Sequence, residues 1–333
     1  MRRALTAGVI VLVAATVAPP LRAYLKIGTF VGDEVVGIQW TNQPIRYFVT
    51  DRDAPGVTAT QFQATLAASF ASWSGQPDVA LSTQFGGFTG LEPTENDVQT
   101  VIGFQSHPEL DRTLGATTFT IDDTTGTLLA SDIFLNTAFQ WSVAPNGQSN
   151  RFDVQSILTH EVGHLLGLGH SAIGETQVQT GGGRAVLGKR AVMFPIAYPP
   201  GSIEDRAVKA DDIAGITDIY GTSAAQQELG AISGRVTLNG AGVFGAHVLA
   251  FNPATGDMVG GFTLTDAGDF VIAALKPGHY VVRVEPLDDA DIDGFFDEDS
   301  GVNINFQVTY YAKLVVVPAG GASGTIQIKV KSK

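Results

Sequence analysis

Two stretches of the chain carry apolar residues at the spacing of one helix face. In residues 58–73 the apolar positions follow Thr58, which can cap the helix: they are Phe62, Leu66, Phe70 and Trp73. In residues 152–166 the apolar positions follow Asn150 and Asp153, which can cap that helix: they are Val154, Ile157, Leu158, Val162 and Leu165. Neither stretch contains proline, so we predict a helix in each.

Short runs rich in β-branched and aromatic residues lie around these helices, separated by Gly, Pro, Asn and Asp clusters. The predicted strands of the first half are residues 45–49, 80–85, 98–104, 114–121 and 128–135. Residues 24–35 are expected to form a short arm or strand. Helices and strands in this order predict an α/β lobe of the α+β type with a mixed sheet.

The pattern changes after Gly221. Residues 222–229 read as a short polar linker, and the chain then alternates between strand-like runs and turn residues. The predicted strands are residues 232–238, 246–251, 261–264, 270–275, 280–284, 303–311, 313–317 and 324–330. Regular short strands of this kind predict that residues 230–333 form an all-β sandwich.

The N-terminus has the pattern of a secretory signal. Arg2 and Arg3 precede the apolar run 4–18, and Ala23 offers a small residue at the expected cleavage point. The apolar run is shorter than the roughly 20 residues of a membrane span. We therefore expect residues 1–23 to be a signal peptide, with a secreted, extracellular protein and no stable membrane anchor.

Composition narrows the class of partner. The net charge of −13 argues against nucleic acid and anionic membranes as partners and suits an exported protein. The 39 glycines favour β-rich, turn-rich structure. Because there is no cysteine, disulfides cannot stabilise the fold, and bound metal ions become plausible stabilisers.

The candidate metal ligands of the chain are concentrated in residues 159–171. Four helical residues at about 100° each place His160 and His164 on one helix face, roughly 6 Å apart along the axis. Gly167 and Gly169 can end the helix and turn the chain back, so that His170 supplies a third ligand. Three imidazoles with one open position are typical of catalytic zinc.

Glu161 lies beside this predicted ion without being one of its ligands. Zinc can activate a water, and a neighbouring carboxylate can take its proton and later pass it to a leaving amine. Glu161 is therefore the predicted general base. The alternative is an amphipathic helix with two surface histidines, which we disfavour because five fixed residues in eleven positions rarely arise by chance.

The motif His160-Glu161-x-x-His164-x-x-Gly167-x-x-His170 resembles the signature of the metzincin zinc endopeptidases. Ser171 after the third histidine is similar to the matrixin branch, the matrix metalloproteinase relatives. Residues 191–195 resemble the matrixin Met-turn, which implies that Met193 lies beneath the zinc ligands. Residues 211–221 resemble the closing helix of that domain, at whose start we expect two aspartates, Asp211 and Asp212, to act as caps.

Two departures from the matrixin pattern matter. Residues 103–141 hold only His107 where matrixins carry a histidine- and aspartate-rich segment, so no second zinc is predicted. A Gly-rich insertion between Ser171 and Met193 leaves the specificity pocket undefined. The resemblance also implies that substrate lies along an edge strand, which we assign to residues 115–121.

The second half resembles the carboxypeptidase-regulatory-like domain, a transthyretin-type sandwich, through residues 234–248, 265–270 and 275–280. We read His247 and His279 in it as structural. A surface-binding or substrate-binding role for this domain is compatible with the resemblance.

An acidic run lies between residues 287 and 302. Its spacing matches the start of a calcium loop, but the twelfth position is Ser300 instead of glutamate. A solvated acidic loop explains the run equally well. The calcium ligands would be Asp289, Asp291, Asp293 and Asp297.

Together these patterns predict a signal peptide (1–23), a matrixin-like zinc metalloendopeptidase domain (24–221), a linker (222–229) and a β-sandwich (230–333). The predicted substrates are proteins or peptides. The alternatives are a zinc-binding adhesive protein without proteolysis and a zinc amidase acting on non-peptide amides.

Overall fold

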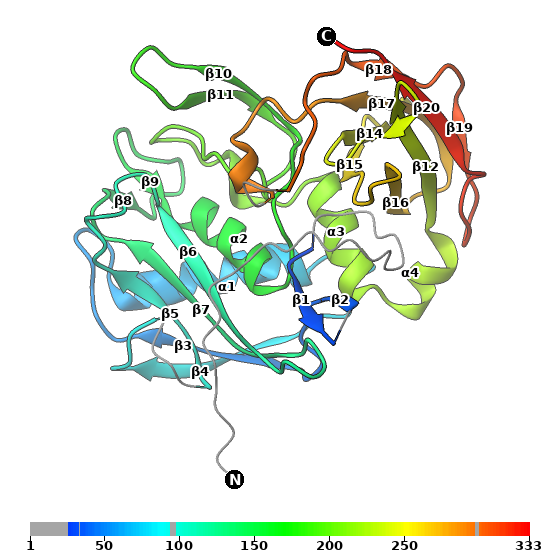
Figure 1. The fold of residues 1–333 in the computed structure, drawn as a ribbon. Helices are drawn as coiled ribbons and strands as arrows, with labels where there is room; N and C mark the ends of the chain where they lie inside the picture. The colour runs from blue at the N-terminus through cyan, green and yellow to red at the C-terminus, as the bar shows by residue number, and fades with distance from the viewer. Residues whose placement is uncertain (1–25, 33, 94–97, 297–299) are drawn as a thin grey trace.

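The computed structural model describes residues 26–32, 34–93, 98–296 and 300–333. The predicted signal peptide, residues 1–23, lies outside them. Within the described residues no helix is both long enough and apolar enough to cross a bilayer. The described chain forms a mixed α/β region followed by a region made mostly of β-sheet, as predicted (Figure 1).

A five-stranded sheet with the order β4-β3-β5-β7-β6 organises the first region. Neighbouring strands are parallel except at the β6–β7 pair, which is antiparallel and leaves β6 on the edge. The predicted edge strand is therefore confirmed. The strands are β3 (Ile45–Thr50), β4 (Thr83–Thr89), β5 (Thr100–Gln105), β6 (Gly115–Ile121) and β7 (Leu128–Asn136).

Three helices complete this region: α1 (Ala59–Ser74), α2 (Val154–Leu165) and α3 (Ala210–Tyr220). Helices α1 and α2 pack against each other beside the sheet (Figure 1). Thr58 caps α1 as predicted, because its hydroxyl accepts a hydrogen bond from the Gln61 backbone N–H. Trp73 is fully buried between the two helices, and its indole N–H donates to the Thr159 carbonyl at 2.9 Å.

Smaller elements surround the sheet. The pairs are β1 (Gly28–Val31) with β2 (Glu34–Gly37), β8 (Trp141–Ser142) with β9 (Phe152–Asp153), and β10 (Gly174–Val178) with β11 (Arg184–Lys189); η1 spans Glu204–Arg206. The Gly-rich insertion thus forms the β10–β11 hairpin. The expected N-terminal arm contains β1, and just before β1 the Ile27 N–H donates to the Gly167 carbonyl at 3.0 Å.

The predicted linker is partly helical. Residues Ser223–Glu228 form α4, which begins where the Thr222 hydroxyl accepts from the Ala225 backbone N–H. This local cap satisfies an N–H group at the helix start, so a polar segment without a helical apolar stripe still forms a helix turn.

Two sheets make the sandwich. One contains β12 (Gly230–Leu238), β13 (Ala241–Gly242), β16 (Asp269–Leu275) and β20 (Ile326–Val330). The other contains β14 (His247–Phe251), β15 (Met258–Phe262), β17 (Gly278–Glu285), β18 (Thr309–Tyr310) and β19 (Val315–Val317), with η2 (Ile292–Gly294) in the connection after β17.

Two predicted strands of the sandwich were placed wrongly. The strand predicted at 261–264 is β15, because pairing of Met258 with Phe251 and Phe262 with His247 sets its register. The strand predicted at 303–311 shortens to β18, since Phe306 makes only an isolated bridge, to Ser332. Pairing with another strand decided both outcomes, and the pattern of one strand does not specify that partner.

The two regions share apolar contacts. Ala214 of α3 belongs to the core of the sandwich. A separate cluster joins Ala172 and Phe194 of the first region to Phe262, Phe295 and neighbouring residues of the second. The sandwich is thus packed directly against the helix and loops that follow His170.

We predict that Asp153→Ala lowers the free energy of unfolding by about 2–3 kcal/mol. The buried Asp153 carboxylate caps α2 at the Ser156 N–H, 2.8 Å away, and forms an ion pair with Arg206. Urea unfolding followed by tryptophan fluorescence tests this, because all three tryptophans belong to the first region. The exposed Asp123→Ala serves as control, with an expected change under about 0.5 kcal/mol; equal midpoints for the two variants would contradict the prediction.

Candidate metal centre and active site

Helix α2 presents the first two histidines and Glu161. Its buried face, with Val154, Leu158, Val162 and Leu165 all fully inaccessible, fixes the helix rotation against the sheet and α1. Asp153 and not Asn150 is the cap, because its carboxylate accepts from the Ser156 N–H. With this rotation fixed, the polar side chains at 160, 161 and 164 all line the same cleft.

Gly167 turns the chain back toward the helix. It has a φ of +96°, and a Cβ there would overlap the Ile38 carbonyl oxygen. A side chain would therefore meet both an unfavourable backbone conformation and a steric clash. The turn brings His170 beneath His164, as the sequence predicts.

The three imidazoles converge through their Nε2 atoms. The Nε2 of His164 lies 3.1 Å from that of His160 and 3.2 Å from that of His170. Ligands 2.0–2.1 Å from a tetrahedral zinc ion are about 3.3 Å apart, so this spacing fits the ion. Among the described residues these three are the only group of His and acidic side chains found with metal-ligand spacing.

Each histidine donates its other ring N–H to a backbone carbonyl. Nδ1 of His160 lies 2.8 Å from the Val192 oxygen, and Nδ1 of His164 lies 2.8 Å from the Leu168 oxygen. Nδ1 of His170 lies 2.5 Å from the oxygen of Gly294, in the sandwich region. These acceptors select the tautomer in which Nε2 carries a lone pair.

Burial keeps the three rings neutral. Desolvation is the largest cause that lowers the pKa of all three, to about 3 for His164, and the neighbouring imidazoles lower the pKa of His160 and His164 further. Three lone pairs then point at one another without a proton between them. That arrangement is repulsive unless a cation lies between them, so the residues present fit zinc.

Met193 packs under α2. A Cβ at Gly163 would overlap the Met193 sulfur, so the glycine leaves room for the thioether. The buried carboxylate of Asp212 accepts from the N–H groups of Val192 at 2.8 Å and Met193 at 3.1 Å. It therefore fixes the turn whose Val192 carbonyl orients His160.

Capping of α3 is confirmed for Asp212, while the N-cap residue itself is Lys209 and the printed bonds of Asp211 go to other segments. Asp212 accepts from the Lys209 N–H, as a cap would, in addition to holding the Met193 turn. Asp211 instead accepts from the Ser171 hydroxyl at 2.5 Å and from the Gly260 N–H at 2.7 Å. The sequence shows no signal for these roles, because both depend on segments distant in the chain.

Glu161 is buried at the cleft wall. The Thr117 hydroxyl of β6 donates to its Oε2 at 2.8 Å. Burial raises the pKa of Glu161 to about 7, while this hydrogen bond opposes the rise. A carboxyl group with such a pKa can both accept and release a proton near neutral pH. We did not predict Thr117 from the sequence.

A cleft of about 740 Å³ runs past the histidines. Its walls are the start of β6, the segment after Met193, the tip of the β10–β11 hairpin, and Asp291 of the sandwich region. Lys189 in this wall is buried and pairs with Asp205 at 2.8 Å. Burial lowers the pKa of Lys189, and the Asp205 carboxylate opposes that shift.

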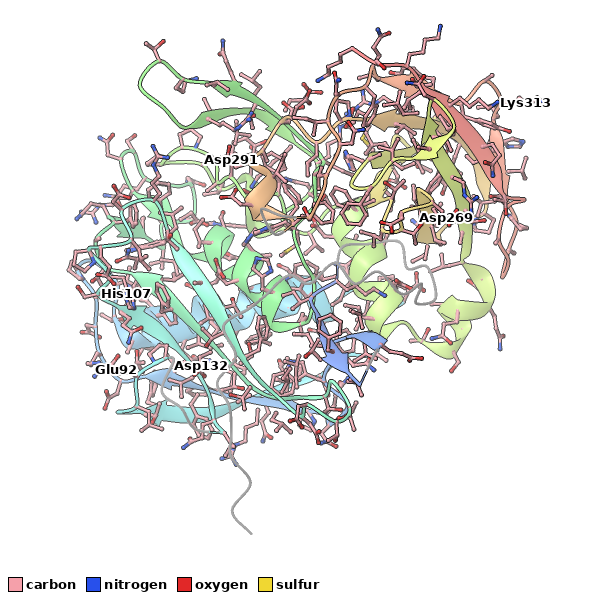
Figure 2. The ribbon with its side chains drawn as sticks, viewed as in Figure 1. Glu92, His107, Asp132, Asp269, Asp291 and Lys313 are labelled. Atoms are coloured by element: carbon pink, nitrogen blue, oxygen red, sulfur yellow. The ribbon has the colours of Figure 1, made fainter. Side chains whose placement is uncertain are left out.

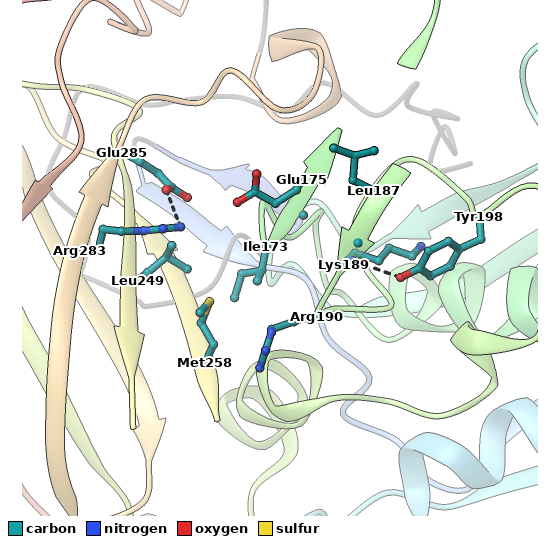
Figure 3. Close-up of a pocket in the computed structure, with 12 residues that line it drawn as sticks. Ile173, Glu175, Leu187, Lys189, Arg190, Tyr198, Leu249, Met258, Arg283 and Glu285 are labelled. Carbon is teal, nitrogen blue, oxygen red and sulfur yellow. Dashed lines mark hydrogen bonds and ion pairs between the residues drawn. The ribbon is translucent and has the colours of Figure 1, made fainter. Parts of the chain in front are cut away.

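A second cavity of about 550 Å³ lies where the two regions meet. Figure 3 shows Glu175, Lys189 and Tyr198 on one side of it and Leu249, Met258 and Arg283 on the other. Lys189, the last residue of β11, lines both cavities. The end of β11 therefore lies between the cleft at the histidines and the second cavity.

Comparison with known proteins agrees with this geometry. Residues 39–180 match the Matrixin family model. The matched segment includes the three histidines and Glu161, and it ends before Met193 and α3.

Known metalloendoproteinases resemble short segments of the chain. Metalloendoproteinase 1-MMP of Arabidopsis thaliana is 39% identical over 69 residues, which is 21% of this chain and 14% of the relative. Metalloendoproteinase 1 of Glycine max is 37% identical over 22% of this chain and 18% of the relative. Matrilysin of Rattus norvegicus is 34% identical over 23% of this chain and 22% of the relative. The chain thus spans less than a quarter of these relatives' lengths.

One solved structure, The Bacillus anthracis TIE protein, aligns with 32% of this chain and 17% of that chain at 13% identity, with a TM-score of 0.22. This overlap is too slight to describe the fold. The likeness of residues 230–333 to the carboxypeptidase-regulatory-like domain stays a prediction.

The acidic run contacts the matrixin-like region. The Asp289 carboxylate accepts from the Thr176 N–H at 3.0 Å, and Asp291 pairs with Arg184. Asp293 is exposed in η2, and Asp297 lies outside the described residues. The calcium site stays a prediction that the described contacts do not test.

We predict that Thr117→Val moves the acid limb of the kcat/KM profile to higher pH by about one unit. The hydroxyl stabilises the Glu161 carboxylate, so its removal raises the pKa of Glu161, and the base becomes protonated at a higher pH. Initial rates of peptide hydrolysis across pH measure the shift. Thr118→Val, on the exposed face of the same strand, should leave the limb in place; an equal shift in both variants would contradict a specific role for Thr117.

Proposed function

We propose that this protein is a zinc endopeptidase of the matrixin type that hydrolyses internal peptide bonds of proteins. The observation that carries the proposal is the convergence of three neutral imidazoles beside a buried carboxylate in an open cleft. The Matrixin match over residues 39–180 supports it independently of that geometry.

His160, His164 and His170 would hold the ion. Bound zinc supplies a Lewis acid that polarises the scissile carbonyl and activates water. Glu161 accepts the proton of the attacking water, and we place it on Oε1, because Thr117 donates to Oε2. Glu161 then gives the proton to the leaving amine.

Strand β6 supports an extended peptide as substrate. It is the antiparallel edge of the sheet, and its first residues line the cleft next to α2. An edge strand offers unpaired backbone groups that a peptide can join as an added strand. We therefore place the substrate backbone along residues 115–117, with a side chain entering the space bounded by residues 194–197.

Secretion is part of the proposal and is supported by the sequence pattern of residues 1–23. Detection of the protein in the culture medium, with its N-terminus at or near residue 24, would support it. Retention of that segment in the cell-associated protein would argue against it.

We predict that Glu161→Gln lowers the rate of casein or gelatin hydrolysis by at least about 100-fold at equal zinc content. The amide keeps the size of the side chain and an acceptor for Thr117, but it cannot take a proton. Elemental analysis establishes the zinc content of each form. The exposed Glu175→Gln on the β10–β11 hairpin is the matched control, with activity expected to be retained.

Two outcomes would redirect the proposal. If the wild type binds zinc and cleaves no protein in a panel of unstructured substrates, the zinc-binding adhesive function takes its place. If it cleaves small non-peptide amides instead, the site belongs to an amidase.

A further inference from the structure

The third histidine differs from the other two in the origin of its hydrogen-bond acceptor. The acceptors of His160 and His164 are the carbonyls of Val192 and Leu168, which belong to the same region as the histidines. The acceptor of His170 is the carbonyl of Gly294, 124 residues away in the sandwich region.

Gly294 is held by a compact turn. Its N–H donates to the Asp291 carbonyl at 3.0 Å, and the N–H groups of Phe295 and Phe296 donate to the Ile292 carbonyl at 2.9 Å each. These bonds direct the peptide between residues 294 and 295 toward the imidazole. The carbonyl therefore does not belong to a freely moving loop.

Two aromatic side chains anchor this turn. Phe295 is fully buried and Phe296 is nearly so, in the cluster that includes Phe194 beside Met193 and Phe262 of β15. The Phe295 ring also lies edge-on to the His170 imidazole, with centroids 5.9 Å apart. The contact thus combines a hydrogen bond with apolar packing on the same histidine.

The preceding residues hold the β10–β11 hairpin. Asp289 accepts from the Thr176 backbone N–H, its own carbonyl accepts from the Thr176 hydroxyl at 2.5 Å, and Arg184 donates to the Asp288 carbonyl at 3.0 Å. Asp291, labelled in Figure 2, pairs with Arg184 of β11. Residues 288–296 of the sandwich region therefore contact both the third histidine and one wall of the cleft.

A separate link acts on the residue after His170. Asp211 accepts from the Ser171 hydroxyl and from the Gly260 N–H of β15. The position of the third histidine is thereby tied to the sandwich at two points, one through its ring and one through its backbone neighbour.

We propose that residues 288–296 position the zinc ligand His170, so that metal affinity depends on the docked sandwich region and metal binding in turn stabilises the docking. The physical reason is that the Gly294 carbonyl selects the tautomer and ring orientation of His170. Coupling of this kind is reciprocal, because binding and docking share one free energy. The inference rests on the zinc site proposed above and does not require proteolysis.

The first test is the zinc affinity of full-length Phe295→Ala, made in a Glu161→Gln background to prevent self-cleavage. Loss of the anchor releases the Gly294 carbonyl, and we expect zinc to bind about 10- to 100-fold more weakly in competition with a chromophoric chelator. Phe306→Ala is the matched control, because Phe306 is also fully buried in the sandwich but belongs to its central core. We expect its zinc affinity to equal that of the background protein.

Circular dichroism of the metal-free proteins establishes that both variants are folded. A folded Phe295→Ala with unchanged zinc affinity would overturn the proposal, and so would an equal loss in Phe306→Ala.

A second measurement needs no further substitution and covers the case in which Phe295→Ala does not fold. Hydrogen exchange of the Glu161→Gln protein is compared with and without zinc. We expect zinc to slow exchange at least about tenfold at the N–H groups of residues 294–296 while leaving β20 unchanged. Equal exchange of residues 294–296 in both states would overturn the coupling. Because both tests use a protein without its base, their outcome is independent of whether the wild type is a protease.

Discussion

The structure depends on holding three uncharged imidazoles with their lone pairs directed at one point. Neutral nitrogens about 3 Å apart repel one another, and burial prevents the alternative of protonating them. Three backbone carbonyls make this arrangement possible by accepting the opposite ring N–H groups. They belong to the turn after α2, to the Met193 turn, and to the η2 segment of the sandwich region.

Each acceptor is itself fixed by packing or by a buried carboxylate. Gly167 and its contact with Ile38 shape the turn that presents Leu168, and Asp212 binds the two N–H groups that shape the Met193 turn. The turn at Gly294 is anchored by Phe295 and Phe296. The site therefore draws its geometry from most of the chain, although its ligands lie within eleven residues. A cleft open to an edge strand completes the arrangement and suits an extended peptide.

Much of this was visible in the sequence where the signal is local. The apolar periodicity around 152–166 predicts α2, with Asn150 and Asp153 as the candidate caps, and helical spacing alone places His160, Glu161 and His164 together. The strand predicted at 114–121 is β6, one residue shorter, and the resemblance to matrixins had assigned the edge to residues 115–121. Prediction was poorer where a neighbouring strand decides the bounds of a strand. The strand predicted at 261–264 is β15 at residues 258–262, and residues 303–311 form only a short strand. In both cases the register depends on the neighbouring strand, which the local sequence does not identify.

By itself, then, the sequence determined that three histidines and Glu161 come together, because this follows from spacing within about a dozen residues. It also determined the class of the two regions, through the order of their helices and strands. Only the tertiary structure decided what surrounds the base and ligands: Thr117 on Glu161, Asp212 beneath the Met193 turn, Asp211 on Ser171, and Gly294 on His170. These partners lie between 19 and 124 positions from the groups they hold. A single sequence does not show that a threonine, an aspartate or a glycine carbonyl will make such a hydrogen bond, because the bond forms only when folding brings the two segments together.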